Sequence, residues 1–143
     1  DVYPPPLPDE LITDFSQCKW FCKIDLTNAY LQMEVHPDSQ HLLTVNTHIG
    51  LFRYHRLVFG LSSAPAIFQS VMDQVLRGLQ HCRAYLDDCL IGGKTKGECE
   101  TTVLEVLRRL NEHNIKINEK KSSWFQTSIS FLGLIISEHG KSP

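Results

Sequence analysis

The sequence lacks any apolar run that approaches the ~20 residues of a membrane-spanning helix. It also lacks, at its start, the basic segment followed by an apolar one that is typical of a signal peptide. Its five cysteines are an odd number, which argues against a disulfide framework and indicates free thiols in a reducing compartment. Because no Asp-Thr-Gly or Asp-Ser-Gly triplet occurs, an aspartic protease is excluded. These absences together predict an intracellular protein.

The composition is that of one ordinary globular domain. The 143 residues are 42% hydrophobic and 21% charged, and the net charge is −2. The charge is distributed unevenly, because residues 1–50 carry seven acids against Lys19 and Lys23, whereas the remainder carries twelve Lys and Arg against nine acids. A basic excess in the later two thirds of the chain is compatible with a nucleic-acid partner.

One group of cysteines and histidines has a spacing close to that of a zinc finger. Cys18, Cys22, His36 and His41 form the pattern C-x3-C-x13-H-x4-H. A zinc finger places both histidines on one helix, and Pro37 directly after His36 would break such a helix. We therefore expect no zinc site here.

Hydrophobic periodicity predicts a mixture of helices and strands. A short helix is expected from Pro8, and a clear amphipathic helix is expected over 62–79, with Ser62 or Ser63 as its cap and Pro65 in its first turn. The other expected elements are a helix over 97–114, strands over 19–26, 27–36, 115–118 and 129–137, a hairpin over 41–57 that turns at Gly50, and a hairpin over 82–93. This order predicts an α+β fold in which both long helices cover one face of the sheet.

Two adjacent carboxylates, Asp87 and Asp88, interrupt the apolar segment CRAYLDDCLIGG, and Asp25 ends another strand-like segment. Three carboxylates that meet from neighbouring strands form an oxygen-rich site for hard divalent cations. Two Mg²⁺ ions about 3.5–4 Å apart can activate an attacking oxygen and stabilise the leaving oxygen of a phosphoryl transfer. An Asp-Asp pair is also common in plain hairpin turns, so the residues alone leave both interpretations open.

Five segments in a fixed order resemble the palm motifs of reverse transcriptases, above all those of gypsy-type LTR retrotransposons and related retroviruses. They are KIDLTNAYLQM (23–33), FGLSSAPAIFQSVM (59–72), YLDD (85–88), INEKKSSWF (117–125) and ISFLGLIIS (129–137). The opening YPPPLPDEL (3–11) is similar to the segment before the first palm motif. The resemblance implies a polymerase palm, an antiparallel sheet with helices on one face, together with part of the fingers. It implies one reverse transcriptase domain fragment over residues 1–143, up to the primer grip, without thumb, ribonuclease H or integrase.

The resemblance also implies which residues perform catalysis. Asp25, Asp87 and Asp88 match the catalytic carboxylates and metal ligands, and the backbone carbonyl of Leu26 matches a further ligand for two Mg²⁺ ions, which Mn²⁺ could replace. Lys121 aligns with a lysine that protonates the leaving pyrophosphate. Ser122 stands where gypsy elements often have cysteine, a difference that we expect to leave the chemistry unaffected.

The remaining carried-over positions concern the nucleotide and the primer. Tyr30 matches the aromatic residue that excludes a 2′-hydroxyl, and Gln69 matches a glutamine that contacts the incoming nucleotide. Leu26 matches a further residue of the nucleotide-binding site. The positions that match primer or template contacts are Tyr85, Leu86, Phe131, Leu132 and Gly133.

The implied function is RNA-directed DNA polymerisation, in which a primer 3′-hydroxyl is extended with dNTPs on an RNA or DNA template during retroelement replication. The implied partners are template and primer, dNTPs, and the ribonuclease H and integrase domains of a full-length polyprotein, with no membrane partner. The implied location is a cytoplasmic retroelement particle or the nucleus. The main alternative is a catalytically inactive retroelement-derived fragment that binds nucleic acid or protein. A metal-dependent nuclease is a second alternative, but no motif supplies the fourth carboxylate or the water-activating group that it needs.

Overall fold

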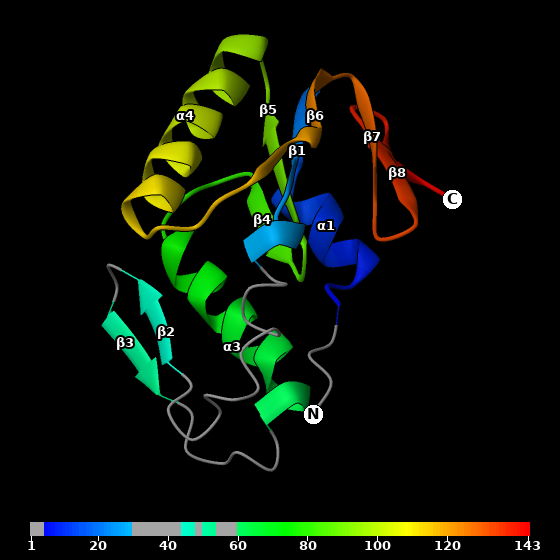
Figure 1. Cartoon of the computed structure of the whole chain (residues 1–143). Coiled ribbons are helices and arrows are strands. Elements are labelled where there is room, and N and C mark those ends of the chain that lie inside the picture. Colours follow the sequence, from blue (N-terminus) through cyan, green and yellow to red (C-terminus); the bar gives the residue numbers. More distant parts are fainter. Residues whose placement is uncertain (1–4, 30–43, 48–49, 54–59) are drawn as a thin grey trace.

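The computed structural model describes residues 5–29, 44–47, 50–53 and 60–143 (Figure 1). The helices are α1 (Pro8–Asp14), α3 (Gly60–Val75) and α4 (Lys96–Glu112). The strands are β1 (Trp20–Asp25), β2 (Thr44–Thr47), β3 (Gly50–Arg53), β4 (Cys82–Tyr85), β5 (Asp88–Gly93), β6 (Asn118–Gln126), β7 (Ser128–Phe131), β8 (Leu134–Ser137) and β9 (Gly140–Ser142). None of the helices in these ranges is long and apolar enough to cross a membrane.

The central sheet has four antiparallel strands in the order β4-β5-β1-β6. β1 pairs with β5 along its whole length, from Trp20 opposite Gly93 to Asp25 opposite Asp88. β4 and β5 form a hairpin in which Tyr85 pairs with Asp88. The two-residue turn of this hairpin therefore lies at the same end of the sheet as the last residue of β1.

The two faces of the sheet pack against different elements, because successive strand residues point to opposite sides. Cys22 and Ile24 of β1 belong to a core that includes α3 and α4, which both lie on one side of the sheet in Figure 1. Phe21 of β1 and Leu90 of β5 belong to a second core with α1 and the β7–β8 hairpin on the other side. The predicted α+β arrangement, with both long helices on one face, is confirmed.

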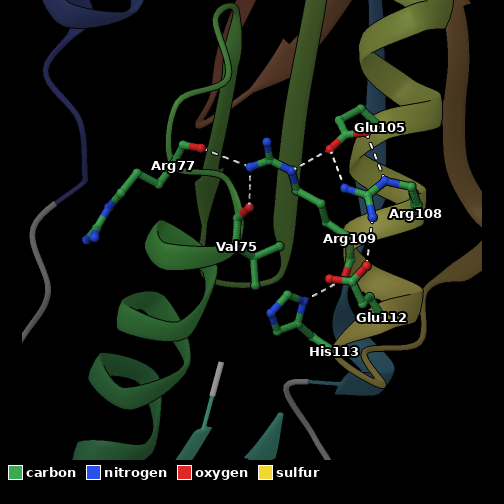
Figure 2. Close-up of polar contacts among 7 residues, drawn as sticks. All are labelled: Val75, Arg77, Glu105, Arg108, Arg109, Glu112 and His113. Atoms are coloured by element: carbon green, nitrogen blue, oxygen red, sulfur yellow. Dashed lines mark hydrogen bonds and ion pairs between the residues drawn. The ribbon is translucent and has the colours of Figure 1, made fainter. Parts of the chain in front are cut away.

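A cluster of charged residues fixes the end of α3 against α4 (Figure 2). The Arg109 guanidinium donates hydrogen bonds to the carbonyls of Val75 at 2.8 Å and Arg77 at 2.9 Å, and its Nε donates to Glu105 at 2.7 Å. Val75 ends α3 and Arg77 lies in the turn after it, where carbonyls have no partner within the helix, so Arg109 satisfies groups that would otherwise need water. Arg108 bonds Glu105 and Glu112 on the exposed side of the same helix.

Several predicted boundaries of the helices were wrong. α3 begins at Gly60, so Ser62 and Ser63 are its third and fourth residues and not its cap, and Pro65 lies beyond the first turn. α4 runs over Lys96–Glu112 and not over 97–114. It is capped by Thr95, whose hydroxyl accepts a hydrogen bond from the Glu98 N–H at 3.0 Å. The predicted strand over 27–36 begins with helical residues at 27–29, and its remainder lies outside the described residues.

Several predicted boundaries of the strands also differ from the structure. The predicted strand over 115–118 is replaced by the longer β6, which begins at its last residue. The predicted strand over 129–137 is a hairpin, because Leu132 and Gly133 both have positive φ between β7 and β8. Gly50 begins β3 opposite Thr47 and is not the turn itself.

Candidate active site

The three predicted catalytic carboxylates lie at one end of the central sheet. Asp25 is the last residue of β1 and Asp88 is the first residue of β5, and their Cα atoms are paired across the two strands. Asp87 precedes Asp88 in the hairpin turn and is exposed. The N–H of Leu26 donates a hydrogen bond of 2.6 Å to the Asp87 carbonyl, which ties the turn to the end of β1. The fold therefore brings Asp25 together with Asp87 and Asp88, which lie 62 and 63 positions later in the chain.

Hydrogen bonds fix Asp25 at both its backbone and its side chain. The Asp25 N–H donates to the Ser122 Oγ at 2.9 Å. Its Oδ1 accepts a hydrogen bond of 2.9 Å from the N–H of Thr27, two residues later, as Asp side chains do where a strand ends. One carboxylate oxygen thus has a set direction before any ligand binds.

The electrostatics of the site favour a bound cation. Burial raises the pKa of Asp88 above its ordinary value, the charges of Asp87 and Asp25 raise it further, and Lys23 opposes this rise. Carboxylates that repel one another in a half-buried place are stabilised by a divalent cation, and carboxylate oxygens are the ligands that Mg²⁺ prefers. The residues present therefore fit a divalent metal. Among the described residues, no three Asp, Glu, His or Cys side chains lie close enough together to form a ready-made metal cluster.

Gln69 supports the hairpin turn from α3. It is 3% exposed. Its Nε2 donates to the Ala84 carbonyl at 2.8 Å, and its Oε1 accepts from the Leu86 N–H at 3.0 Å. Leu86 has φ +52°, a conformation that leucine rarely adopts, so the amide of Gln69 stabilises a strained turn next to Asp87. The direct contact with a nucleotide that we predicted for Gln69 stays a prediction.

Lys121 lies in an irregular part of β6 beside Asp25. Lys23 of β1 pairs with Ser123, but Asp25 pairs with Asn118, so β6 bulges over the residues between. The side chain of Lys121 is exposed, and its N–H donates to Asn118 Oδ1 at 3.3 Å. The bulge places a lysine that is distant in sequence near Asp25 in the register of β1 and β6.

The β7–β8 hairpin carries the residues predicted to hold the primer. Phe131 is buried in the second core, whereas Leu132 and Gly133 form the turn, with φ values of 55° and 78°. Lys23 connects this hairpin to β1, because its Nζ donates to the Ser130 carbonyl at 2.8 Å. The same lysine is the cation that opposes the rise in the pKa of Asp88.

Most of the predicted site residues therefore lie in neighbouring elements. One predicted residue is not described by the structure, and several contacts at the site were not predicted. Tyr30 falls outside the described residues, so its predicted role stays a prediction. The contacts of Thr27, Lys23 and Ser122 were not predicted from the sequence. For Ser122, only its replacement of a cysteine was considered, and that difference was expected to leave the chemistry unaffected. The proximity of Thr27 to Asp25 was the only one of these signals that could be read from the sequence.

The sequence matches a known protein family over most of its length. Residues 4–136 match the family model described as Reverse transcriptase (RNA-dependent DNA polymerase). The retrovirus-related Pol polyprotein from transposon 297 of Drosophila melanogaster is 34% identical over 145 positions, covering 100% of this chain and 14% of that protein. The transposon Tf2-3 polyprotein of Schizosaccharomyces pombe is also 34% identical, covering 100% of this chain and 11% of that protein. The chain thus spans only a small part of the length of these curated relatives.

Solved structures share the fold. A foamy viral protease-reverse transcriptase in complex with double-stranded DNA superposes with a TM-score of 0.72 at 24% identity, covering 99% of this chain and 25% of that chain. A foamy viral protease-reverse transcriptase in complex with an RNA/DNA hybrid gives a TM-score of 0.65 at 25% identity, covering 92% of this chain and 18% of that chain. Taken with the family match, the antiparallel sheet and the helices on one face show that this chain belongs to the reverse transcriptase (RNA-dependent DNA polymerase) family.

Proposed function

We propose that this chain is the palm, with part of the fingers, of an RNA-directed DNA polymerase that extends a primer 3′-hydroxyl with dNTPs by two-metal nucleotidyl transfer. One observation carries the proposal: Asp25 and Asp88 are paired across β1 and β5, with Asp87 beside them in the turn. Membership of the family gives these three like charges at one end of the sheet a chemical purpose. A plain turn would not need Asp25 on the neighbouring strand.

The three aspartates and the Leu26 carbonyl are the groups that would hold Mg²⁺, or Mn²⁺ in its place. The bound ions supply activation of the attacking hydroxyl and stabilisation of the leaving pyrophosphate. Asp25 is already oriented by Ser122 and Thr27, and Asp87 is fixed through its carbonyl by the Leu26 N–H. These hydrogen bonds support the proposal because catalytic ligands need such orientation before the substrate arrives.

The other residues of the chain bind and orient the substrates in this proposal. Tyr85 and Leu86, and Leu132 and Gly133 of the β7–β8 turn, contact the primer, while the buried Phe131 anchors that turn. Tyr30 excludes the 2′-hydroxyl of a ribonucleotide. Gln69 acts on the nucleotide site through the turn that it supports, because its amide is buried and bound to Ala84 and Leu86. Lys121 donates the proton that the leaving pyrophosphate requires.

The proposed partners are a primer annealed to an RNA or DNA template, dNTPs, and the ribonuclease H and integrase parts of a longer polyprotein. The Pol polyproteins among the relatives support the polyprotein context. The foamy viral enzymes in complex with double-stranded DNA and with an RNA/DNA hybrid support the choice of nucleic acid. The proposed location is a cytoplasmic retroelement particle.

The test is Mg²⁺-dependent incorporation of dNTPs on an RNA template annealed to a DNA primer. Both this chain and a longer polyprotein segment that contains it are assayed. Asp87→Asn should abolish incorporation, whereas Glu100→Gln, which removes an exposed charge on α4, should leave it unchanged. If no wild-type form incorporates dNTPs but the chain binds primer–template, the alternative of a non-catalytic binding domain is favoured.

A further inference from the structure

The pairing of β1 with β6 is irregular at the residue that matters most for the proposed chemistry. Between the pairs Lys23–Ser123 and Asp25–Asn118, β1 advances by two residues while β6 advances by five. The extra residues of β6 bulge away from the ladder and include Lys121. Bulges of this kind occur beside active sites, where they redirect a side chain. Without a further contact, the backbone of Asp25 would lose part of its strand pairing at this point.

The hydroxyl of Ser122 supplies that contact. Its Oγ accepts a hydrogen bond of 2.9 Å from the Asp25 N–H and donates one of 2.8 Å to the Asn118 carbonyl. Both bonds are half-buried. The Asn118 side chain in turn accepts a hydrogen bond from the Lys121 N–H. One hydroxyl thus joins the two sides of the bulge and replaces the missing ladder bond.

This contact requires a group that both donates and accepts. Alanine at this position would leave the Asp25 N–H and the Asn118 carbonyl without their partner, and a half-buried unpaired polar group is costly. Threonine keeps the hydroxyl. The thiol of cysteine is only a weak donor and a weak acceptor, so it should hold the bulge less firmly than serine does.

We propose that Ser122 is a positioning residue that, by holding the backbone N–H of Asp25, keeps the Asp25 carboxylate in place for a divalent cation and keeps the Lys121 bulge in register with it. The inference rests on the proposed function, since it gives a role to a hydroxyl beside the proposed metal ligand. It departs from the expectation that serine in place of cysteine leaves the chemistry unaffected.

Ser122→Ala, Ser122→Thr and Ser122→Cys test the proposal, with the neighbouring Ser123→Ala as the matched control. Ser123 is also half-buried in β6, and its hydroxyl makes no hydrogen bond within the described ranges. The first measurement is Mn²⁺ binding to the chain by water-proton relaxation, which needs no catalysis. Ser122→Ala should weaken Mn²⁺ binding by about tenfold, as loss of a group that orients a ligand typically does. Ser122→Thr should stay near wild type, and Ser122→Cys should lie between the two.

The second measurement is primer extension by the longer polyprotein segment at saturating Mg²⁺. Ser122→Ala should lower kcat by about tenfold and leave the KM for dNTP unchanged, because the lost contact orients a catalytic ligand and not the base. If Ser122 only stabilised the fold, both Ser122→Ala and Ser122→Cys would instead lower the amount of folded protein. Urea unfolding of these two variants would reveal such a loss.

The outcomes separate this inference from the proposed function. If the wild type extends primers and Asp87→Asn does not, but Ser122→Ala binds Mn²⁺ and extends primers as Ser123→Ala does, the positioning role is overturned and the polymerase stands. If no wild-type form extends primers, the proposed function fails, and the ratio of Mn²⁺ affinities between Ser122→Ala and Ser123→Ala still decides the role of Ser122. Equal Mn²⁺ affinities of Ser122→Ala and Ser123→Ala, or no Mn²⁺ binding by the wild type, would overturn the positioning role of Ser122.

Discussion

Replacing Gln69 with methionine should destabilise the chain and loosen the turn that carries Asp87. Methionine is similar in length and apolar, so it fills the space but makes none of the amide's hydrogen bonds. The substitution leaves the buried Ala84 carbonyl and the half-buried Leu86 N–H without partners, at about 1–3 kcal/mol each. The positive φ of Leu86 also loses the contact that offsets its strain. Because some relaxation will occur, we expect the free energy of unfolding to fall by about 2–4 kcal/mol.

Urea unfolding and amide hydrogen exchange measure this effect. Gln74→Met is the matched control, since Gln74 lies on the same helix and its side chain makes no hydrogen bond within the described residues. Exchange at residues 84–88 should become faster in Gln69→Met and stay unchanged in Gln74→Met. Equal urea midpoints for the two variants, or unchanged exchange at 84–88, would refute the conclusion that the amide supports the turn.

Three further predictions concern the scaffold. Arg109→Met should lower the free energy of unfolding by about 1.5–3 kcal/mol, measured by urea unfolding, because the carbonyls of Val75 and Arg77 lose a charged donor; an unchanged midpoint would contradict this. Hydrogen bonds from Arg108, and to a lesser extent from Arg109, lower the pKa of Glu105 from 4.5 to about 2. The contribution of these bonds to the stability of the fold is therefore complete above pH 4.5 and is lost as the pH falls toward 2. The difference in urea midpoint between wild type and Glu105→Gln should therefore shrink over that range, and a constant difference would be inconsistent with the ion pairs. Gly93→Ala should destabilise by about 1–3 kcal/mol in thermal unfolding, because its Cβ would lie 2.7 Å from the Cys99 Cα. In the control Gly97→Ala, the Cβ would lie 3.9 Å from the Thr95 hydroxyl, an ordinary contact, so this variant should not destabilise.

The position of the three proposed catalytic carboxylates at one end of the sheet could be predicted from the sequence because their signal is local. Asp87 and Asp88 interrupt an apolar hairpin, and Asp25 ends a strand, so each position shows its unusual character within a few residues. The amphipathic helices could be predicted for the same reason, since the apolar stripe of α3 repeats at helical spacing. The boundaries of α3 were less accurate, because Pro65 suggested a first turn although the helix begins at Gly60.

The supporting contacts could not be predicted, because they depend on tertiary pairing. Gln69 looks like an ordinary polar residue of a helix, and only the packing of α3 under β4 shows that its amide is buried. The bulge of β6 depends on its register with β1, which no local pattern in NEKKSS reveals. Ser122 and Lys23 bond backbone groups of residues that are distant in sequence, so their contacts could be found only in the folded structure.

The measurement that tests the central claim most directly is primer extension with an RNA template, a DNA primer, dNTPs and Mg²⁺. The wild-type chain, a longer polyprotein segment that contains it, and the Asp87→Asn form of each are compared under one condition. We expect incorporation by the longer wild-type segment, loss of incorporation in Asp87→Asn, and no incorporation when Mg²⁺ is removed. Incorporation that survives Asp87→Asn, or its absence in both wild-type forms, would contradict the claim that these carboxylates form a polymerase active site.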